Sequence, residues 1–162
     1  MKTFFIAAIA SLALSTSSCM ENKSENKETG LQAIFPKGEK LPNDYFTGNA
    51  YLKPLVARDK NNDFSAGNVT FEPGARTVWH THPKGQVLIV IDGNGIYQEK
   101  GKPAQSLKVG DVVKVPENTE HWHGATATSK MAHINITNYK GDEQVHWLQP
   151  VSEEDYNNAN KN

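Results

Sequence analysis

Four residues in two short segments have the types and the spacing to bind one metal ion. His80 and His82 alternate on a predicted strand, so both imidazoles project from one face, about 7 Å apart along the strand, and can reach the same ion. A turn at residues 83–85 then brings Gln86 back on the next strand, where its amide oxygen can become a third ligand. His121 follows in a second segment and is the expected fourth ligand.

This ligand set predicts Lewis-acid chemistry. Three neutral imidazoles and a neutral amide leave the double positive charge of a divalent ion uncancelled, so the ion should polarise a bound oxygen more strongly than a site containing a carboxylate would. Nitrogen and oxygen ligands without a thiolate suit Mn, Fe, Co, Ni or Zn, and the spacing does not choose among these transition metals.

The elements that position these residues are short strands. Between residues 45 and 148, runs rich in Val, Ile, Thr and aromatic residues alternate with turn residues, which predicts an all-β domain. The runs are 50–57, 66–71, 76–82, 86–92, 95–99, 105–109, 112–115, 121–126, 131–138 and 144–148. Residues 92–95 (Asp-Gly-Asn-Gly) favour a tight hairpin turn between the fourth and fifth runs. Ten short strands in about a hundred residues imply a sandwich or a barrel that leaves few strand edges exposed.

Two further histidines could contribute to a pocket. On the run 131–138, alternation places His133, Asn135 and Thr137 on the face opposite to the isoleucines. An inward polar face in a small barrel would indicate a functional cavity, whereas a solvated polar face with the isoleucines in the core is equally compatible with alternation. His123 shares the face of His121 and could be a fifth ligand, an acid–base group or a buried pocket residue.

The two segments resemble the two sequence motifs of the cupin superfamily. The first motif is Gly, five residues, His-x-His, three or four residues, Glu, six residues and Gly, and residues 74–93 match it with Gln86 in place of Glu. The second motif is Gly, five residues, Pro-x-Gly, two residues, His, three residues and Asn. Residues 110–125 match it except that Asn118 replaces the inner Gly and Ala125 replaces the final Asn.

The resemblance covers about residues 45–148 and implies a single cupin barrel, a jelly-roll-like double-stranded β-helix with the metal inside its open end. The sequences WHTHP at 79–83 and HWHGAT at 121–126 are similar to a narrower group, the small bacterial cupins related to carboxymuconolactone-decarboxylase-associated proteins. That group includes manganese-dependent hydroxynitrile lyases. Membership implies the scaffold more firmly than the reaction, because one fold hosts many chemistries.

Carried over to this chain, the resemblance implies a site for a small-molecule substrate. It makes His80, His82, Gln86 and His121 the metal ligands, with manganese as the first choice of ion. It also places His123 and His133 as catalytic groups above the ion, with Thr77 as a polar pocket contact. In a lyase of this kind, the metal holds the hydroxyl oxygen of a cyanohydrin, His133 or His123 removes the proton, and the carbon–carbon bond breaks to a carbonyl compound and cyanide.

Two other function classes remain open from the sequence. One is an iron-dependent dioxygenase, because histidine-rich cupin sites can bind substrate and O₂ at open metal positions. Gln86 argues against it, since a neutral set lacks the carboxylate of the facial triad that suits Fe(II). The other is a non-catalytic module that holds a small ligand in the pocket.

The first residues have the pattern of an export signal. Lys2 precedes an apolar stretch of 11 residues at 4–14, too short to span a bilayer, which needs roughly 20 residues. Small residues at 15–18 lead to Cys19, the only cysteine of the chain, at the position that a bacterial lipoprotein signal lipidates. We therefore expect a signal peptide at 1–18, a lipidated Cys19 and a protein anchored in the bacterial periplasm or cell envelope; an ordinary cleaved signal is the alternative.

The remaining segments and the charge set expectations about partners. Residues 20–44 predict a flexible tether and an extended arm, and 149–162 predict a tail with a short helix that starts near Ser152. The arm at 31–44 could add to the sheet edge of a second copy, which predicts a homodimer or a higher homo-oligomer. Seventeen Lys and Arg against 18 Asp and Glu give a net charge of −1, which excludes an extended basic surface for nucleic acid. Membrane contact is expected through the lipid anchor only.

Overall fold

The computed structural model describes residues 34–161. The predicted signal peptide, Cys19 and most of the tether lie outside this range. Within the described range, no helix has the length and the hydropathy needed to cross a membrane.

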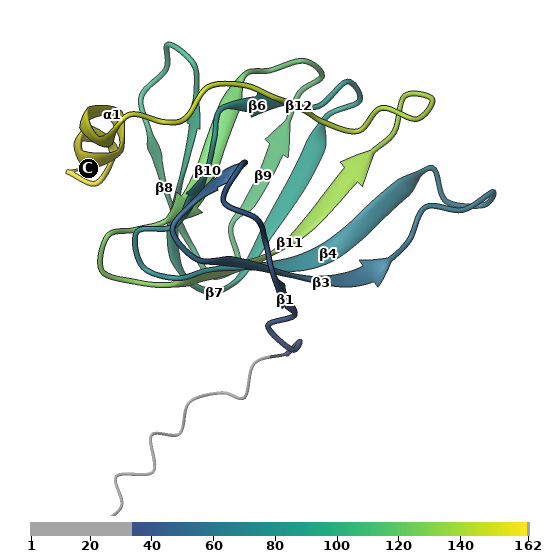
Figure 1. Cartoon of the computed structure of the whole chain (residues 1–162), viewed down its shortest axis with the longest axis horizontal. Helices are drawn as coiled ribbons and strands as arrows, with labels where there is room; N and C mark the ends of the chain where they lie inside the picture. Colours follow the sequence, from purple (N-terminus) through teal and green to yellow (C-terminus); the bar gives the residue numbers. More distant parts are fainter. Residues whose placement is uncertain (1–33, 162) are drawn as a thin grey trace, which may run out of the picture. The chain divides into compact units, whose positions relative to one another are not determined.

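The described residues form a strand-rich domain with one short helix, which confirms the predicted all-β barrel fold with an N-terminal arm and a C-terminal helix (Figure 1). The strands are β1 (Glu39–Lys40), β2 (Phe46–Thr47), β3 (Ala50–Val56), β4 (Phe64–Phe71), β5 (Arg76–Thr77), β6 (His80–Thr81), β7 (Gln86–Glu99), β8 (Gln105–Lys108), β9 (Val112–Val115), β10 (His121–Ala125), β11 (Met131–Asn138) and β12 (His146–Trp147). The helix is α1 (Glu153–Ala159).

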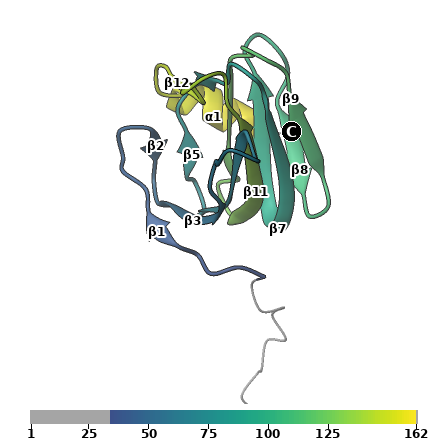
Figure 2. The same ribbon diagram turned by 90° about the vertical axis from the view of Figure 1, so that its right-hand side faces the viewer.

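All strand pairs in this part of the chain are antiparallel, and they join into one curled sheet. The main path runs β1-β3-β4-β11-β7-β10-β5-β2, while β8 and β9 pair with β7, and β6 pairs with β10 and β12. Strand β7 occupies the middle of the sheet, with β11 and β9 beside its first half and β10 and β8 beside its second half (Figures 1 and 2).

The prediction of a tight hairpin turn at residues 92–95 is wrong. In the structure, β7 continues through this segment as one strand of 14 residues. Its first half pairs with β11 and β9, and its second half pairs with β10 and β8. Gly93 has a φ of 69°, and a Cβ on Gly95 would lie 1.9 Å from the Met131 Sδ and 2.6 Å from the Gly124 carbonyl oxygen. The two glycines therefore let the backbone pass from one layer of the curled sheet to the other.

The predicted strand 76–82 divides into β5 and β6. Between them, the amide of Val78 donates to the carbonyl of Tyr45 at 3.0 Å, and the amide of Trp79 donates to the carbonyl of Gln149 at 3.0 Å. Segments from both ends of the domain thus hold the stretch that precedes His80.

The segments that flank residues 45–148 pack against the barrel. In the arm, β1 pairs with β3, and Leu41 packs against the main core cluster, which includes Phe71, Leu88 and Met131. At the other end, residues 149–161 contribute Val151, Tyr156 and Ala159 to a second cluster around Trp122.

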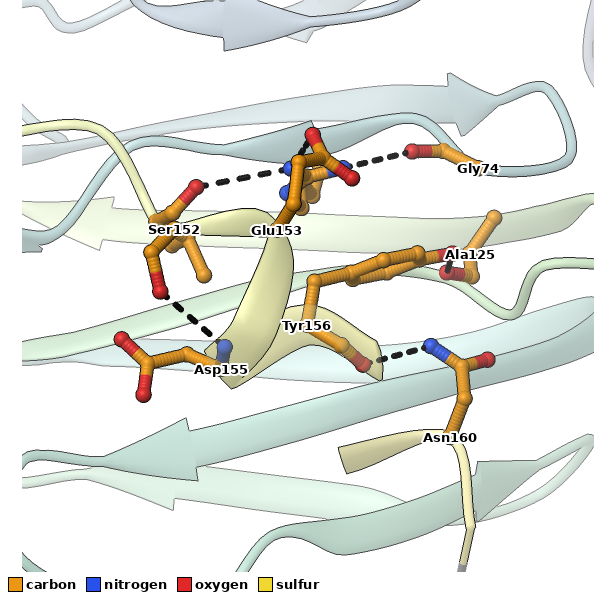
Figure 3. A network of polar contacts seen from close by, with 9 residues as sticks. Gly74, Ala125, Ser152, Glu153, Asp155, Tyr156 and Asn160 are labelled. Carbon is orange, nitrogen blue, oxygen red and sulfur yellow. Dashed lines mark hydrogen bonds and ion pairs between the residues drawn. The ribbon is translucent and has the colours of Figure 1, made fainter. Parts of the chain in front are cut away.

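Helix α1 is tied to the barrel by polar contacts as well as by packing. Ser152 caps the helix by accepting a hydrogen bond from the Asp155 amide at 3.0 Å, and the Tyr156 hydroxyl donates to the Ala125 carbonyl at 3.0 Å (Figure 3). The buried guanidinium of Arg76 lies 4.2 Å from the centre of the Tyr156 ring and pairs with Glu153. Because Arg76 is in β5, the helix supports the strand that carries Thr77.

We expect Gly95→Ala to destabilise the domain more than Gly141→Ala. The new methyl at position 95 would collide with backbone and with Met131, an overpacking cost of about 3 kcal/mol. Gly141 has open space around it and a φ of 61°, so alanine there costs only the left-handed backbone strain, about 1 kcal/mol. Urea unfolding of both variants measures the difference, and equal losses would contradict the role of Gly95 in the bend of β7.

Candidate metal centre

Three predicted ligands meet in the interior at one end of the barrel. One nitrogen of each of His80, His82 and His121 lies within 4.8 Å of the others, and all three side chains are buried. The register explains this arrangement, because His121 of β10 pairs directly with His80 of β6, and His82 follows two residues after His80. The alternation used to interpret the His-x-His segment therefore places both rings toward one point, as the sequence predicted.

Each of these imidazoles is held by a backbone carbonyl at its Nδ1 atom. The contacts are His80 to Val78 at 3.0 Å, His121 to Thr119 at 2.8 Å and His82 to Gln144 at 2.5 Å. A carbonyl only accepts, so each Nδ1 carries the proton and each Nε2 keeps a free lone pair. This is the arrangement by which proteins orient histidine ligands toward a metal.

Gln86 turns its amide oxygen toward the same point. Its Nε2 donates to the Asn135 Oδ1 at 2.8 Å, which leaves its Oε1 3.2 Å from the His121 Nε2. With the His121 proton on Nδ1, two lone-pair acceptors face each other, an arrangement that a cation stabilises. The buried Nε2 of His82 has no hydrogen-bond partner in the structure, and a metal ion would satisfy it as well. The donor set therefore fits a divalent transition metal.

Burial keeps these histidines neutral. Loss of hydration lowers the pKa of His121 to about 4, holds that of His80 well below its ordinary value and lowers that of His82. Neutral imidazole is the form that binds a metal, so at neutral pH the site requires no deprotonation before an ion enters.

A cavity of about 600 Å³ opens in front of these residues. His80, His82 and Gln86 line it, and its other walls are mainly apolar and aromatic, with Phe46, Phe71 and Trp147 among them. Arg58 is the only Lys, Arg, Asp or Glu side chain in the described lining, and it is paired with Asp63 at 2.8 Å and with Asp142 at 3.2 Å. The cavity therefore suits a neutral small molecule with an apolar body.

The other predicted site residues lie around this cavity at different depths. Thr77 and His123 line it, and the His123 amide donates to the Thr77 Oγ1 at 3.2 Å. The Nδ1 of His123 is buried without a hydrogen-bond partner among residues 34–161. His133 packs edge to face with His123, with ring centroids 5.0 Å apart, and stacks on Phe71 at 5.7 Å, but it is not among the residues that line the cavity.

Sequence reasoning missed the contacts that orient the ligands. The three backbone carbonyls have no sequence signal, because every residue carries one. The alternation in β11 did place Asn135 and Thr137 together with His133 on one polar face of the strand. It left open whether this polar face or the opposite face is buried. The hydrogen bond from Gln86 to Asn135 settles that the polar face points to the interior.

Comparison with known proteins agrees with this geometry. The family model described as Cupin domain matches residues 67–137. A protein of Granulicella tundricola named (R)-mandelonitrile lyase is 41 % identical over 132 residues, covering 82 % of this chain and 98 % of its own. The crystal structure of a cupin-like protein from Thermotoga maritima is 49 % identical, with a TM-score of 0.74 over 78 % of this chain and 96 % of its own. The structure of DMSP lyase DddQ from Ruegeria pomeroyi, at 19 % identity and a TM-score of 0.53 over 68 % of this chain and 55 % of its own, shares the fold.

We expect the buried His133 to make the metal-free protein less stable in acid. Burial lowers its pKa from an ordinary 6.5 to about 3, so below about pH 6.5 the unfolded chain binds a proton there that the folded protein refuses. Stability is therefore full above that pH and falls as the pH decreases, by about 1.4 kcal/mol per pH unit for this one proton. In His133→Phe, which keeps a ring against Phe71, the free energy of unfolding between pH 6 and pH 4 should fall less steeply by that amount. An unchanged slope in urea titrations would contradict this assignment.

Proposed function

Because the chain belongs to the cupin family, we propose that it is a metal-dependent lyase that cleaves a small cyanohydrin into a carbonyl compound and hydrogen cyanide. The observation that carries this proposal is the convergence of one nitrogen from each of three imidazoles, with the Gln86 Oε1 beside His121, at the wall of a mainly apolar cavity. The relative named (R)-mandelonitrile lyase, 41 % identical over most of both chains, supports this reaction over other cupin chemistries.

His80, His82, Gln86 and His121 would hold the ion. We propose manganese because the donors include no thiolate and because the two sequence segments resemble a group of cupins that includes manganese-dependent hydroxynitrile lyases. The ion would supply Lewis acidity toward the hydroxyl oxygen of the substrate. The chain's neutral ligands contribute by leaving the charge of the ion undiminished. The apolar walls contribute by excluding water and by packing against the body of the substrate.

His123 would accept the hydroxyl proton. It is the one of the two further histidines that lines the cavity, so a substrate hydroxyl bound there would lie beside its imidazole. As the O–H bond breaks, its electrons form the carbonyl double bond, and the carbon–carbon bond to the nitrile breaks with its electron pair leaving on cyanide. The protonated His123 then returns the proton to cyanide, so the products are an aldehyde and HCN. His133 and Phe71 would fix the plane of the His123 ring through their packing contacts.

The lyase proposal is tested with mandelonitrile as the substrate. We expect Mn²⁺-loaded protein to release benzaldehyde, and both the metal-free protein and His80→Ala to lose this activity. His123→Ala should keep its manganese but lose about 10²- to 10⁴-fold in rate, the usual contribution of a general base. His146→Ala, which removes an exposed histidine outside the cavity lining, serves as the control and should keep the parent's rate. If the protein binds these metals but releases no benzaldehyde with Mn, Fe, Co, Ni or Zn, each tested in turn, the lyase proposal is refuted and a non-catalytic binding module is favoured.

Gln86→Glu tests whether the neutral ligand matters to the reaction. The carboxylate adds attraction for a dication, so metal affinity should stay or increase. The turnover rate should fall about tenfold or more, because the added negative charge weakens the pull on the substrate oxygen and about 1.4 kcal/mol of lost transition-state stabilisation already means a factor of ten. Equal turnover in parent and variant, at equal manganese content, would show that neutrality at position 86 does not tune this site.

A further inference from the structure

We propose that Asn135, held in place by Thr137, is the positioning residue that decides which end of the Gln86 amide faces the three imidazoles. This inference rests on the proposed metal role of Gln86 and extends it to two residues beside the ligand set in the cavity lining.

The need for such a residue follows from the chemistry of a glutamine ligand. The two ends of its side-chain amide are nearly equal in size, and rotation by 180° exchanges an oxygen, which can bind a cation, for an NH₂ group, which repels one. Packing alone distinguishes the two orientations poorly. A hydrogen-bond partner that only accepts, placed against one end of the amide, distinguishes them sharply.

The structure provides such an acceptor in the Asn135 Oδ1. This oxygen accepts from the Gln86 Nε2 at 2.8 Å and from the Thr137 Oγ1 at 2.9 Å. Thr137 is buried, and its backbone pairs with that of Gln86 across β11 and β7, so the three side chains share one interior face. By donating to the Asn135 Oδ1, the Thr137 hydroxyl holds that oxygen beside Gln86. The same oxygen then accepts a hydrogen bond from the NH₂ group of Gln86.

The opposite orientation would be incompatible with an ion at this point. The Gln86 Oε1 now lies 3.2 Å from the His121 Nε2, and a rotated amide would place its NH₂ group there instead. The rotation would also set the side-chain oxygen of Gln86 against the Asn135 Oδ1. A glutamate at position 86 has no such requirement, since its two oxygens are equivalent and either one can face a cation. The dependence on Asn135 should therefore exist with Gln86 and disappear with Gln86→Glu.

The test is a double-mutant cycle read by Mn²⁺ affinity, with free Mn²⁺ measured from its EPR signal during titration of purified metal-free protein. In the parent background, Asn135→Ala should weaken Mn²⁺ binding about 10- to 100-fold, the usual effect of removing a partner of a ligand. In the Gln86→Glu background, the same change should alter affinity less than about threefold. Asn135→Asp, which keeps an acceptor toward the NH₂ of Gln86, should bind Mn²⁺ at least as tightly as the parent.

Asn68→Ala is the matched control. Asn68 is a buried asparagine of β4 opposite Ile134, on the other face of the same sheet, and it donates to the Pro36 carbonyl at 3.2 Å. Its loss removes a buried amide that hydrogen-bonds to Pro36 and not to Gln86, so Mn²⁺ affinity should match the parent once circular dichroism has verified folding.

The outcomes separate this inference from the proposed function. Parent-like affinity in Asn135→Ala, or an equal loss in the Gln86 and Gln86→Glu backgrounds, would overturn the positioning role while leaving the metal site intact. The positioning role would also be overturned if Asn135→Asp bound Mn²⁺ as weakly as Asn135→Ala does. Failure of the parent itself to bind Mn²⁺ would overturn the metal role of the site and this inference together, independently of whether any lyase activity is found.

Discussion

The main constraint on this fold is the burial of five imidazoles in one small interior. All five are buried, and burial makes protonation of each of them costly; they are His80, His82, His121, His123 and His133. A neutral ring still needs a partner for its N–H group. For three of the rings the partner is a carbonyl from a segment beside a strand, so the loops before β6, β10 and β12 are fixed by the same contacts that orient the ring nitrogens.

The polar cluster and the apolar cavity beside it complement each other. The ligand atoms are all uncharged, and the one Arg of the described lining is already paired with Asp63 and Asp142, so an ion would meet little competing charge on the protein. In such surroundings the field of a dication would be weakly screened, and it would act on the polar atom that a small molecule in the cavity presents to the ion. The aromatic side chains in the cavity wall, Phe71 and Trp147 among them, would pack against the apolar remainder of such a molecule.

The sequence predicted the parts of this arrangement that depend on periodicity. Alternation placed His80 and His82 on one face, and the series of short strands predicted a sandwich or a barrel. The meeting of Gln86 with His121 was implied by the resemblance to the cupin motifs. Sequence reasoning failed where local preference and tertiary context disagree, since Asp-Gly-Asn-Gly favours a hairpin in isolation but lies inside β7 because two flanking strands pair with its halves. It also could not show which of His123 and His133 lines the cavity, because alternation directs both inward; in the structure His123 lines it and His133 does not.

The course of β7 has a consequence for how the domain opens. This strand begins at Gln86 and ends at Glu99, which pairs with His121, so both of its ends lie at the candidate metal centre while its middle bends at the far side. Neither layer of the sheet can separate without breaking the hydrogen bonds of a strand that belongs to both. Opening of the sheet at the cavity therefore requires breaking the pairing of β7 with β11 or with β10, and the β7 amides bonded to these two strands should be among the slowest in the described part of the chain to exchange with solvent.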